Sequence, residues 1–279
     1  LWSRGLGDVY KRQVHMGTGN YNEATARIYT DIGIFTCREP YGTDASSLFN
    51  FLTGYSRPPE YSRFVVAPEE MRGFFLHRID RETGNAKKGL PSGITAKMNS
   101  LTDPAIVEAL CRASRAGVPV KLIVRGICCL IPGVPGQSET ITVRSIVGRF
   151  LEHSRIYKFV NGGNTKVYLG SADWMPRNFD TRVELVFPVE DAALKKRVLQ
   201  ILELMLKDNR NARIMHPDGV YLRADKREKK PLDCQQEFFR IARDSANAAE
   251  YKKRSGPYQA RSGPEQEPTE AVQNPLSSP

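Results

Sequence analysis

The sequence has no long hydrophobic run and no secretion signal. No stretch of about 18 consecutive apolar residues, the length of a membrane-spanning helix, occurs in its 279 residues. The N-terminus also lacks a basic segment followed by an apolar one, which would mark a secretory signal. With 40% hydrophobic residues, the chain can still form a sizeable core. We therefore expect a soluble, cytoplasmic protein with no transmembrane segment.

Cysteine is scarce and is not spaced as metal ligands are. The five cysteines show no paired-ligand spacing, which argues against a zinc site. Two of them are adjacent in an apolar segment that predicts the end of a buried strand. We expect core thiols and predict no metal site formed by side chains. The cysteines are Cys37, Cys111, Cys128, Cys129 and Cys234.

Positive charge exceeds negative charge, and most of the excess lies in the middle of the chain. The formal net charge is +10, of which residues 1–13 contribute +2 and residues 224–279 contribute +1. Residues 14–223 therefore hold +7. A basic folded region favours a polyanionic partner, and nucleic acid, an anionic membrane surface and a phosphate polymer are all compatible with it. A basic surface that serves only solubility is the alternative.

One short motif occurs twice. The segments "GTGNYNEATARIYTD" (17–31) and "GSADWMPRNFDTRVE" (170–184) each begin with glycine, a hydroxyl residue, one further residue and Asn or Asp. In each copy an acidic residue falls fourteen positions after the first glycine. Either copy alone would indicate only a tight turn, but the shared spacing indicates a duplicated unit. The matching residues are Gly17, Thr18, Asn20 and Asp31 in the first copy and Gly170, Ser171, Asp173 and Glu184 in the second.

The segments that flank the first copy predict an irregular end and a helix. Residues 1–13 show no clear period, and we interpret them as a non-native or scar segment. Residues 44–55 predict a helix with Asp44 as its N-cap, followed by a joint at Pro58 and Pro59. The apolar residues expected to face inward are Leu48, Phe49, Phe51 and Leu52.

Alternating strands and helices are predicted over residues 61–223, which points to a layered α/β fold. Beyond Arg223 the polar, charged composition predicts disorder, apart from a short helix at 233–249. The predicted elements before that point are a helix at 68–89, a strand at 93–100, a helix at 103–117, a strand at 118–130, a helix-like piece followed by a strand within 142–163, a strand at 166–174 and a packing helix at 191–208.

A histidine lies shortly before the second copy of the motif. His153, followed by Ser154 and Arg155, forms a His-x-[Lys/Arg] element seventeen residues before Gly170. The imidazole can serve as a proton carrier or nucleophile, and the cation can neutralise charge. The hydroxyl can donate to a phosphate, and the later acid can orient the imidazole. A structural core histidine is the alternative for His153.

This arrangement resembles the phospholipase D fold, in which two half-motifs build one phosphate site. Several further segments are similar to the bacterial polyphosphate kinase family through most of residues 14–223. They include "FLTGYSRPPEY", "AKMNSLTDP", "LIVRGICCLIPGVPG" and "VRSIVGRFLEHSR". The resemblance implies the C-terminal part of one catalytic domain at 14–60, a complete second one at 61–223 and a mostly disordered tail at 224–279.

The activity that the resemblance implies is reversible transfer of the terminal phosphate of ATP to polyphosphate through a phosphohistidine, with Mg²⁺ bound to ATP. The implied partners are ATP or ADP and polyphosphate, without a specific nucleic acid, and the full-length protein is expected to be a homo-oligomer. By family correspondence Tyr29, Arg125 and His153 match nucleotide-contacting positions, and Glu184 is expected nearby. The remaining residues expected to line the site are Asn20, Ser171, Asp173 and Arg182.

The residue chemistry fits these roles. Arg125 follows the buried strand "VKLIV", where α/β sheets place ligand groups, and a guanidinium can clamp phosphate oxygens. An imidazole can take up or release a proton near neutral pH, and His153 is assigned acid–base help or a phosphate contact. Glu184, and likewise Asp31, is expected to fix an imidazole tautomer. The alternatives are an ion-pair role for Arg125 and a core aromatic role for Tyr29.

One departure from the family pattern concerns the phosphorylated histidine. The family carries it in a His-x-Lys element ahead of the first Gly-Thr-Gly-Asn, whereas no histidine occurs between Leu1 and Gln13. The chain is therefore expected to be N-terminally truncated and inactive on its own. Two other functions stay open, a phospholipase D-type phosphodiesterase and a non-enzymatic module that binds polyanions.

Overall fold

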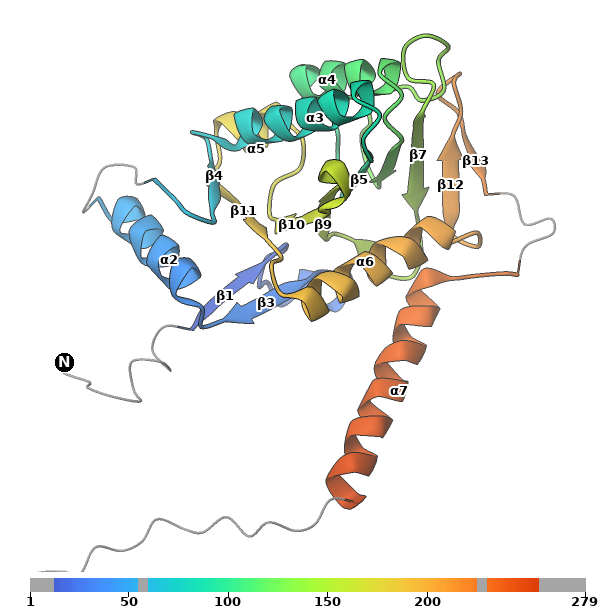
Figure 1. Ribbon diagram of the computed structural model, residues 1–279. Helices are drawn as coiled ribbons and strands as arrows, with labels where there is room; N and C mark the ends of the chain where they lie inside the picture. The colour runs from blue at the N-terminus through green and yellow to red at the C-terminus, as the bar shows by residue number, and fades with distance from the viewer. Residues whose placement is uncertain (1–12, 55–59, 225–229, 256–279) are drawn as a thin grey trace, which may run out of the picture. The chain divides into compact units, whose positions relative to one another are not determined.

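The computed structural model describes residues 13–54, 60–224 and 230–255 (Figure 1). The chain forms two units, Leu1–Glu237 and Phe238–Pro279. The second unit contains most of helix α7 (Cys234–Ser255), which is longer than the helix predicted at 233–249. All other elements belong to the first unit. None of the helices in the described ranges has the length and apolar character needed to cross a membrane.

A nine-stranded mixed sheet organises the first unit. Its centre is a parallel trio, β5, β6 and β7, to which antiparallel strands are added on both sides. The layered α/β fold predicted from the sequence is confirmed. The strands in sheet order are β13 (Tyr221–Arg223), β12 (Ala212–Met215), β7 (Ile141–Ile146), β6 (Val120–Val124), β5 (Ile94–Met98), β9 (Arg155–Phe159), β10 (Lys166–Gly170), β11 (Glu184–Pro188) and β4 (Val65–Ala67).

The predicted strand–helix–strand crossover is present as β5, α4 (Pro104–Arg115) and β6. The side chain of Asp103 caps α4 by accepting a hydrogen bond from the backbone N–H of Ile106 at 3.1 Å, and Pro104 occupies the first turn, where no amide donor is needed. Gly117 follows the helix with φ of +85°, a conformation that glycine adopts without a steric penalty. Local signals in the sequence therefore defined this unit correctly.

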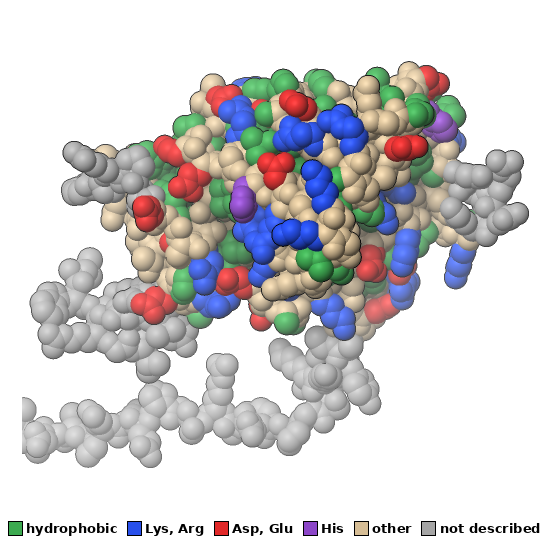
Figure 2. Space-filling model, turned by 45° about the horizontal axis from the view of Figure 1, so that its top comes forward, with side chains coloured by type: hydrophobic (Ala, Val, Ile, Leu, Met, Phe, Trp, Pro, Cys, Tyr) green, Lys and Arg blue, Asp and Glu red, His purple; other side chains and the backbone are tan. Residues whose placement is uncertain are grey.

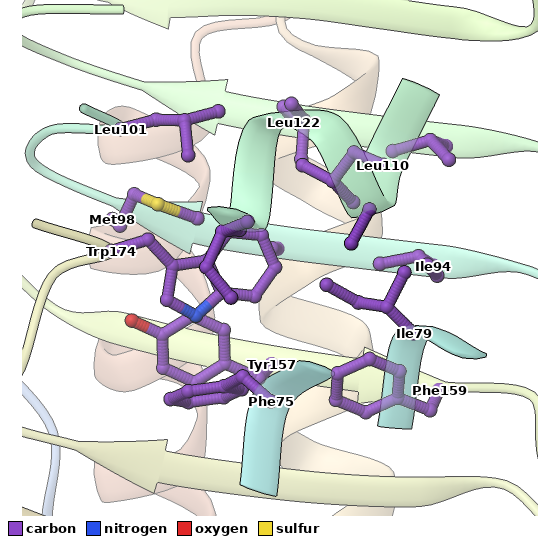
Figure 3. Close-up of a cluster of buried hydrophobic side chains, with 14 of the residues drawn as sticks. Phe75, Ile79, Ile94, Met98, Leu101, Leu110, Leu122, Tyr157, Phe159 and Trp174 are labelled. Carbon is purple, nitrogen blue, oxygen red and sulfur yellow. The ribbon is translucent and has the colours of Figure 1, made fainter. Parts of the chain in front are cut away.

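The main core lies between the sheet and the helices α3 (Met71–Lys87) and α4. Figure 3 shows Phe75 and Ile79 of α3 and Leu110 of α4 directed at side chains of the strands. The Trp174 and Tyr157 rings stack with centroids 5.2 Å apart and an interplanar angle of 20°. Each large aromatic side chain buried here removes apolar surface from water, worth roughly 2–3 kcal/mol. This packing fixes the sheet whose strand ends carry the candidate site.

Helix α6 (Ala192–Lys207) covers the other face of the sheet (Figure 1). The side chain of Asp191 caps its N-terminus by accepting a hydrogen bond from the backbone N–H of Leu194 at 2.8 Å. Val198, Leu202 and Met205 are buried, which fits the packing role predicted for this helix, whereas Leu194 is 44% exposed. Arg144 of β7 donates to the carbonyl of Leu206, so the sheet also holds the C-terminal end of the helix.

The first copy of the motif lies in a smaller substructure. Strands β1 (Val14–Gly17) and β3 (Gly33–Thr36) form an antiparallel pair, and β2 (Tyr29–Thr30) pairs in parallel with β8 (Leu151–Glu152). Helix α2 (Glu39–Leu52) follows. The remaining short helices are η1 (Thr25–Arg27), η2 (Asn161–Gly163) and α5 (Pro176–Asp180).

The start and the buried face of α2 were predicted wrongly. The helix begins at Glu39, five residues before the predicted cap, and Pro40 lies in its first turn. Asp44 is inside the helix and instead accepts hydrogen bonds from the N–H groups of residues 62–64 at 2.6–3.0 Å. The buried face is Tyr41, Asp44 and Ala45, whereas two of the residues expected inside, Phe49 and Leu52, are 66% and 48% exposed.

Two further predictions were wrong. The helix-like piece within 142–163 is strand β7, whose inward residues alternate with period two. The pair Cys128 and Cys129 does not end a buried strand, because β6 stops at Val124 and Cys129 is exposed. Of the five thiols, all free, Cys234 alone is fully buried.

Candidate functional site

The two copies of the repeated motif have the same hydrogen-bonded geometry. In the first, Thr18 Oγ1 donates to Asp31 Oδ1 at 2.8 Å and accepts from the N–H of Ile32 at 3.0 Å. In the second, Ser171 Oγ donates to Glu184 and accepts from the N–H of Leu185 at 3.1 Å. Each hydroxyl therefore ties its own acidic residue to the strand that follows.

The strands around the two copies also match in register. Gly17 of β1 lies opposite Gly33 of β3, and Gly170 of β10 lies opposite Val186 of β11, so the partner is sixteen residues away in both. The residue after each glycine donates its backbone N–H across the pair, Thr18 to Ile32 at 3.0 Å and Ser171 to Leu185 at 2.9 Å. The duplication predicted from sequence spacing is thus present in the structure.

His153 of the second half contacts Asp31 of the first. Its Nδ1 is 3.0 Å and 2.9 Å from the two carboxylate oxygens of Asp31. The parallel pairing of β2 with β8 brings the residues together, and the N–H of His153 donates to the carbonyl of Thr30 at 3.2 Å. A carboxylate only accepts, so we assign the proton to Nδ1, which leaves Nε2 as the basic nitrogen.

The backbone next to Asp31 is closely packed. A Cβ atom added to Gly19 would lie 1.9 Å from Asp31 Oδ2, so no side chain fits at that position while the carboxylate keeps its place. The glycine in the third position of the first copy therefore makes room for the acid that contacts His153. In the second copy that position is Ala172, whose carbonyl accepts from the Tyr157 hydroxyl at 2.6 Å.

Arg155 and Asp173 form a buried ion pair at the centre of the site. Arg155 Nε is 3.1 Å from Asp173 Oδ1, and both side chains are 9% exposed. Arg155 Nη1 also donates to the carbonyl of Thr18 at 2.7 Å and lies 3.1 Å from His153 Nε2. This guanidinium is therefore bonded to both copies of the motif and to the histidine between them.

Arg125 is oriented without a carboxylate partner among the residues described. Its Nε and Nη2 donate to Asn99 Oδ1 at 3.0 Å and 2.8 Å, and Nε also reaches the carbonyl of Glu152 at 3.2 Å. Asn99 is held in turn by Asp173, which accepts from its backbone N–H at 2.8 Å. Arg125 is thus a half-buried cation in a fixed orientation, and no described acid neutralises its charge. A guanidinium in this state is suited to binding a phosphate group.

Tyr29 lies against the imidazole. The two rings are 4.7 Å apart between centroids and tilted by 42°. The structure therefore brings together Tyr29, His153, Arg125 and Asp173 of the predicted site. Asn99, Arg155 and Asp31 complete this group.

The other predicted residues make no hydrogen bond to this group within the described part of the chain. Glu184 accepts from Ser171 and from Asn178 Nδ2, and Arg182 Nη1 is 3.7 Å from Glu184 Oε1. No hydrogen bond within the described ranges connects Glu184 with His153, so the tautomer role falls to Asp31. Asn20 is exposed, and its side chain makes no hydrogen bond or ion pair with the described residues.

A second layer of buried polar groups supports the backbone around His153. Lys97 is fully buried, and its Nζ donates to the carbonyl and hydroxyl of Ser154 at 2.8 Å and 2.9 Å and lies 3.5 Å from Glu152 Oε2. Burial lowers the pKa of Lys97, and the Glu152 carboxylate opposes that shift. Glu152 and Ser154, the residues that flank His153, are therefore both contacted by Lys97 from the interior of the sheet.

Gln235, at the start of α7, holds the segment before His153. Its Oε1 accepts from the N–H of Phe150 at 3.1 Å, while Nε2 donates to the carbonyl of Phe150 at 2.9 Å and to Glu152 Oε1 at 2.7 Å. The segment after residue 223 was predicted to be a tail with one helix. Residues 230–237 instead pack into the first unit, with Cys234 and Gln235 buried.

Several of these supporting residues were missed from the sequence. Asn99 is the last residue but one of the strand predicted at 93–100, and a polar side chain near that end is a signal for a ligand site in an α/β sheet. Arg155 was noted only as the cation of the His-x-[Lys/Arg] element. Lys97, Glu152 and Gln235 gave no local signal, because their role depends on contacts between distant segments.

The chain matches two models of one protein family. The polyphosphate kinase C-terminal domain 1 matches residues 3–58, and the polyphosphate kinase C-terminal domain 2 matches residues 64–235. The matched ranges together contain every residue of the network around His153.

Curated relatives and a solved structure agree with these matches. A polyphosphate kinase of Thermosynechococcus vestitus is 54% identical over 76% of this chain and 29% of its own length. One of Lactiplantibacillus plantarum is 48% identical over 85% of this chain and 33% of its own length. The crystal structure of polyphosphate kinase from Porphyromonas gingivalis superimposes with a TM-score of 0.81 and 38% identity, covering 85% of this chain and 36% of that one.

The chain thus spans about a third of the length of the curated relatives that it matches. Identity near 50% and a family model that covers residues 64–235 are sufficient to assign the family. The chain belongs to the polyphosphate kinase family.

Proposed function

We propose that this chain forms the nucleotide- and phosphate-binding part of an ATP–polyphosphate phosphotransferase. The reaction would move the terminal phosphate of ATP onto the end of a polyphosphate chain, and back. Support comes from the relatives named polyphosphate kinase and from a site built of fixed cations. The single observation that carries the proposal is the contact of His153 with Asp31, which joins the two copies of the motif into one site that also contains Arg125.

In this proposal Arg125 binds phosphate oxygens. Its guanidinium is already oriented by Asn99 and the Glu152 carbonyl, so little side-chain entropy is lost when the phosphate binds. A phosphoryl group in transfer carries charge on its outer oxygens, and catalysis depends mostly on positioning and on stabilising that charge. Arg155 forms an ion pair with Asp173, and its Nη1 lies 3.1 Å from His153 Nε2.

His153 serves as an acid–base group or phosphate contact through Nε2. Asp31 accepts from Nδ1–H, so Nε2, which lies 3.1 Å from Arg155 Nη1, is the nitrogen that would take a proton from, or give one to, an oxygen of the transferring phosphate. The family forms a phosphohistidine at a position ahead of the first Gly-Thr-Gly-Asn, so the proposal does not make His153 the acceptor. Tyr29, with its ring against the imidazole, limits the orientations of His153 and offers a surface to the nucleotide.

We propose that Mg²⁺ arrives bound to ATP. Among the described residues, no group of three or more His, Cys, Asp or Glu side chains could hold a metal ion. Asp31 and Asp173 are each engaged by a cation or imidazole. A site of cations fits a metal held by the phosphates themselves, where the ion would neutralise their charge.

The proposal is tested by binding and labelling. Calorimetric titration of the chain with Mg²⁺–ATP should show binding that Arg125→Gln weakens about tenfold or more, because a charge-assisted hydrogen bond is lost. Lys121→Gln, an exposed cation on β6, should leave the affinity unchanged. Equal affinities in all three proteins would contradict the proposal.

Labelling addresses His153 separately. The chain is incubated with γ-labelled ATP, and the product is tested for the acid-labile, base-stable label that marks phosphohistidine. If label forms and His153→Gln abolishes it, His153 is the acceptor and the acid–base assignment is wrong. The absence of label in the unmodified chain agrees with the assignment made here.

Assembly and location also belong to the proposal. We infer a cytoplasmic homo-oligomer, in line with substrates found in that compartment and with the exposed apolar side chains of α2 and β3, Phe49 at 66% and Phe35 at 76%. Light scattering after size-exclusion chromatography measures the oligomeric state directly.

A further inference from the structure

A basic hollow of about 410 Å³ lies in the first unit, apart from the site at His153. It is bounded by α3, by the start of β10 and by the chain just after β11. Four cations line it, namely Arg63, Arg78, Lys166 and Lys195, and Glu190 is the single acid. Figure 2 turns the side of α3 and α4 toward the viewer, and Lys and Arg side chains gather near the middle of the face that it shows.

The charge of the hollow is only partly neutralised. Glu190 is already shared, because its carboxylate lies 2.8 Å from Arg63 Nε and 2.9 Å from Arg38 Nη1. Arg78 and Lys166 have no ion pair with any described residue. Lys195 has none either, and its Nζ donates to the carbonyl of Thr165 at 3.3 Å. Three cations therefore face one hollow without a counter-charge from the described part of the chain.

Arg78 is held by aromatic rings rather than by an acid. Its guanidinium carbon lies 5.0 Å from the Phe74 ring centroid and 5.4 Å from that of Tyr168, within cation–π range. Its Nε is buried and has no hydrogen-bond partner among the described residues. Arg78 therefore has no acidic partner in the described part of the chain that would compete with an anion bound in the hollow.

The hollow and the site at His153 lie at opposite ends of the same two strands. Lys166 begins β10 and Ser171 follows its end, while Glu184 begins β11 and Glu190 follows its end. With a rise of about 3.3 Å per residue, the two ends of β10 are separated by roughly 15 Å. No residue that lines the hollow belongs to the network around His153.

We propose that this hollow is a second binding site for inorganic polyphosphate, which would hold a stretch of the polymer away from its reacting end. The choice of polymer rests on the proposed function, but the presence of an anion site does not. A chain of bare phosphates needs only cations at its oxygens. Single-stranded nucleic acid also needs aromatic faces for its bases, and here the Phe74 and Tyr168 rings are already covered by Arg78.

The test measures binding of tripolyphosphate to the 279-residue chain at low salt. It is carried out in an Arg125→Gln background, which weakens the site at His153, so that losses in the hollow variants are measured against a reduced contribution from that site. In that background Arg78→Gln should weaken binding about tenfold and Lys195→Gln about threefold. Lys196→Gln is the matched control, because Lys196 is the next residue on α6 and does not line the hollow.

A second measurement needs no substitution. In a ¹H–¹⁵N spectrum of the unmodified chain, the Nε–H signal of Arg78 should shift on addition of tripolyphosphate. The proposal is overturned if Arg78→Gln and Lys195→Gln both bind as the control does, or if the Nε–H signal stays unmoved at saturation. It is also overturned if single-stranded DNA of equal charge displaces tripolyphosphate at equal concentration, which would indicate a general polyanion surface.

These outcomes separate the hollow from the proposed function. If Mg²⁺–ATP fails to bind at Arg125 but the hollow variants still lose affinity for tripolyphosphate, the proposed function fails and the anion site remains. If ATP binds as expected and the hollow variants match the control, the anion site fails alone.

Discussion

Nδ1 of His153 and Oδ2 of Asp31 are 2.9 Å apart, although 122 residues separate the two along the chain. The acid belongs to the first copy of the repeated motif, and the histidine precedes the second. This contact therefore connects the two halves of the duplication at the point where the chemistry is expected, beside the bond from Arg155 Nη1 to the Thr18 carbonyl. Because Asp31 accepts from Nδ1, it determines which imidazole nitrogen carries the proton in the neutral ring.

Replacing Asp31 should release the imidazole. In Asp31→Ala the Nδ1–H loses its acceptor, so His153 is expected to change from one neutral tautomer to a mixture. Long-range ¹H–¹⁵N spectra distinguish the two nitrogens. The chain has only four histidines, and His153→Gln identifies the signal. An unchanged tautomer in Asp31→Ala would mean that Arg155 alone orients the ring.

Because Thr18 and Ser171 make equivalent hydrogen bonds, removing either hydroxyl should lower the free energy of unfolding by a similar amount. Thr18→Val and Ser171→Ala each remove a hydroxyl that donates to an acid and accepts from a backbone N–H. Each should lower the free energy of unfolding by about 1–3 kcal/mol, since a buried donor is left without its acceptor. Urea denaturation of the two variants measures this. A large loss in one variant and none in the other would show that the two copies are not energetically equivalent.

Local sequence signals predicted the parts of the fold that are locally determined. The cap at Asp103, the proline that follows and Gly117 fix α4 between two parallel strands, and each acts within a few residues. The duplication was also visible, because its hydrogen bonds join residues at constant spacing. The equal spacing in the two copies reflects a hydroxyl that bonds to the acid thirteen positions later.

The predictions that failed depended on distant contacts. Asp44 resembles a helix cap in sequence, yet residues 62–64 bind its carboxylate, and Pro40 was the local signal of the true start. The contact of Asp31 with His153 depends on two strands of only two residues each, which leave no periodicity to detect. Gln235 lies in a polar segment whose composition predicts an exposed residue, although its side chain is buried.

Arg125 should not tolerate lysine. Arg125→Lys keeps the charge but loses the planar fork that bonds Asn99 through two nitrogens and reaches the Glu152 carbonyl. We expect affinity for Mg²⁺–ATP to fall about tenfold, nearly as far as in Arg125→Gln. Calorimetric titration of both variants measures this. If Arg125→Lys binds like the unmodified chain, only the charge at this position matters.

Gln235 should stabilise the fold from outside the sheet. Gln235→Ala removes the three hydrogen bonds to Phe150 and Glu152, and we expect a loss of about 1–3 kcal/mol in the free energy of unfolding. Gln236→Ala is the matched control, because Gln236 is the next residue in the chain and its side chain is exposed. Urea denaturation compares the two. Equal stabilities would show that the start of α7 does not hold the segment before His153.

Tyr41 gives a pH-dependent prediction. Its hydroxyl donates to the carbonyl of Pro188 at 2.9 Å, so it attaches α2 to the end of β11. Burial, followed by the nearby Glu190 carboxylate, raises the pKa of Tyr41 from 10.0 to about 12.

The sign of the pH effect follows from this shift. Below pH 10 the phenol is protonated in both the folded and the unfolded chain, so its contribution to stability is complete, and Tyr41→Phe should cost about 1 kcal/mol. Between pH 10 and about 12 the unfolded chain loses the proton first, so the unmodified chain loses stability relative to Tyr41→Phe. Urea denaturation of both proteins across this range measures the difference, in which other titrating groups cancel. A difference that stays constant up to pH 12 would mean that the Tyr41 hydroxyl is not held by Pro188 and Glu190 in solution.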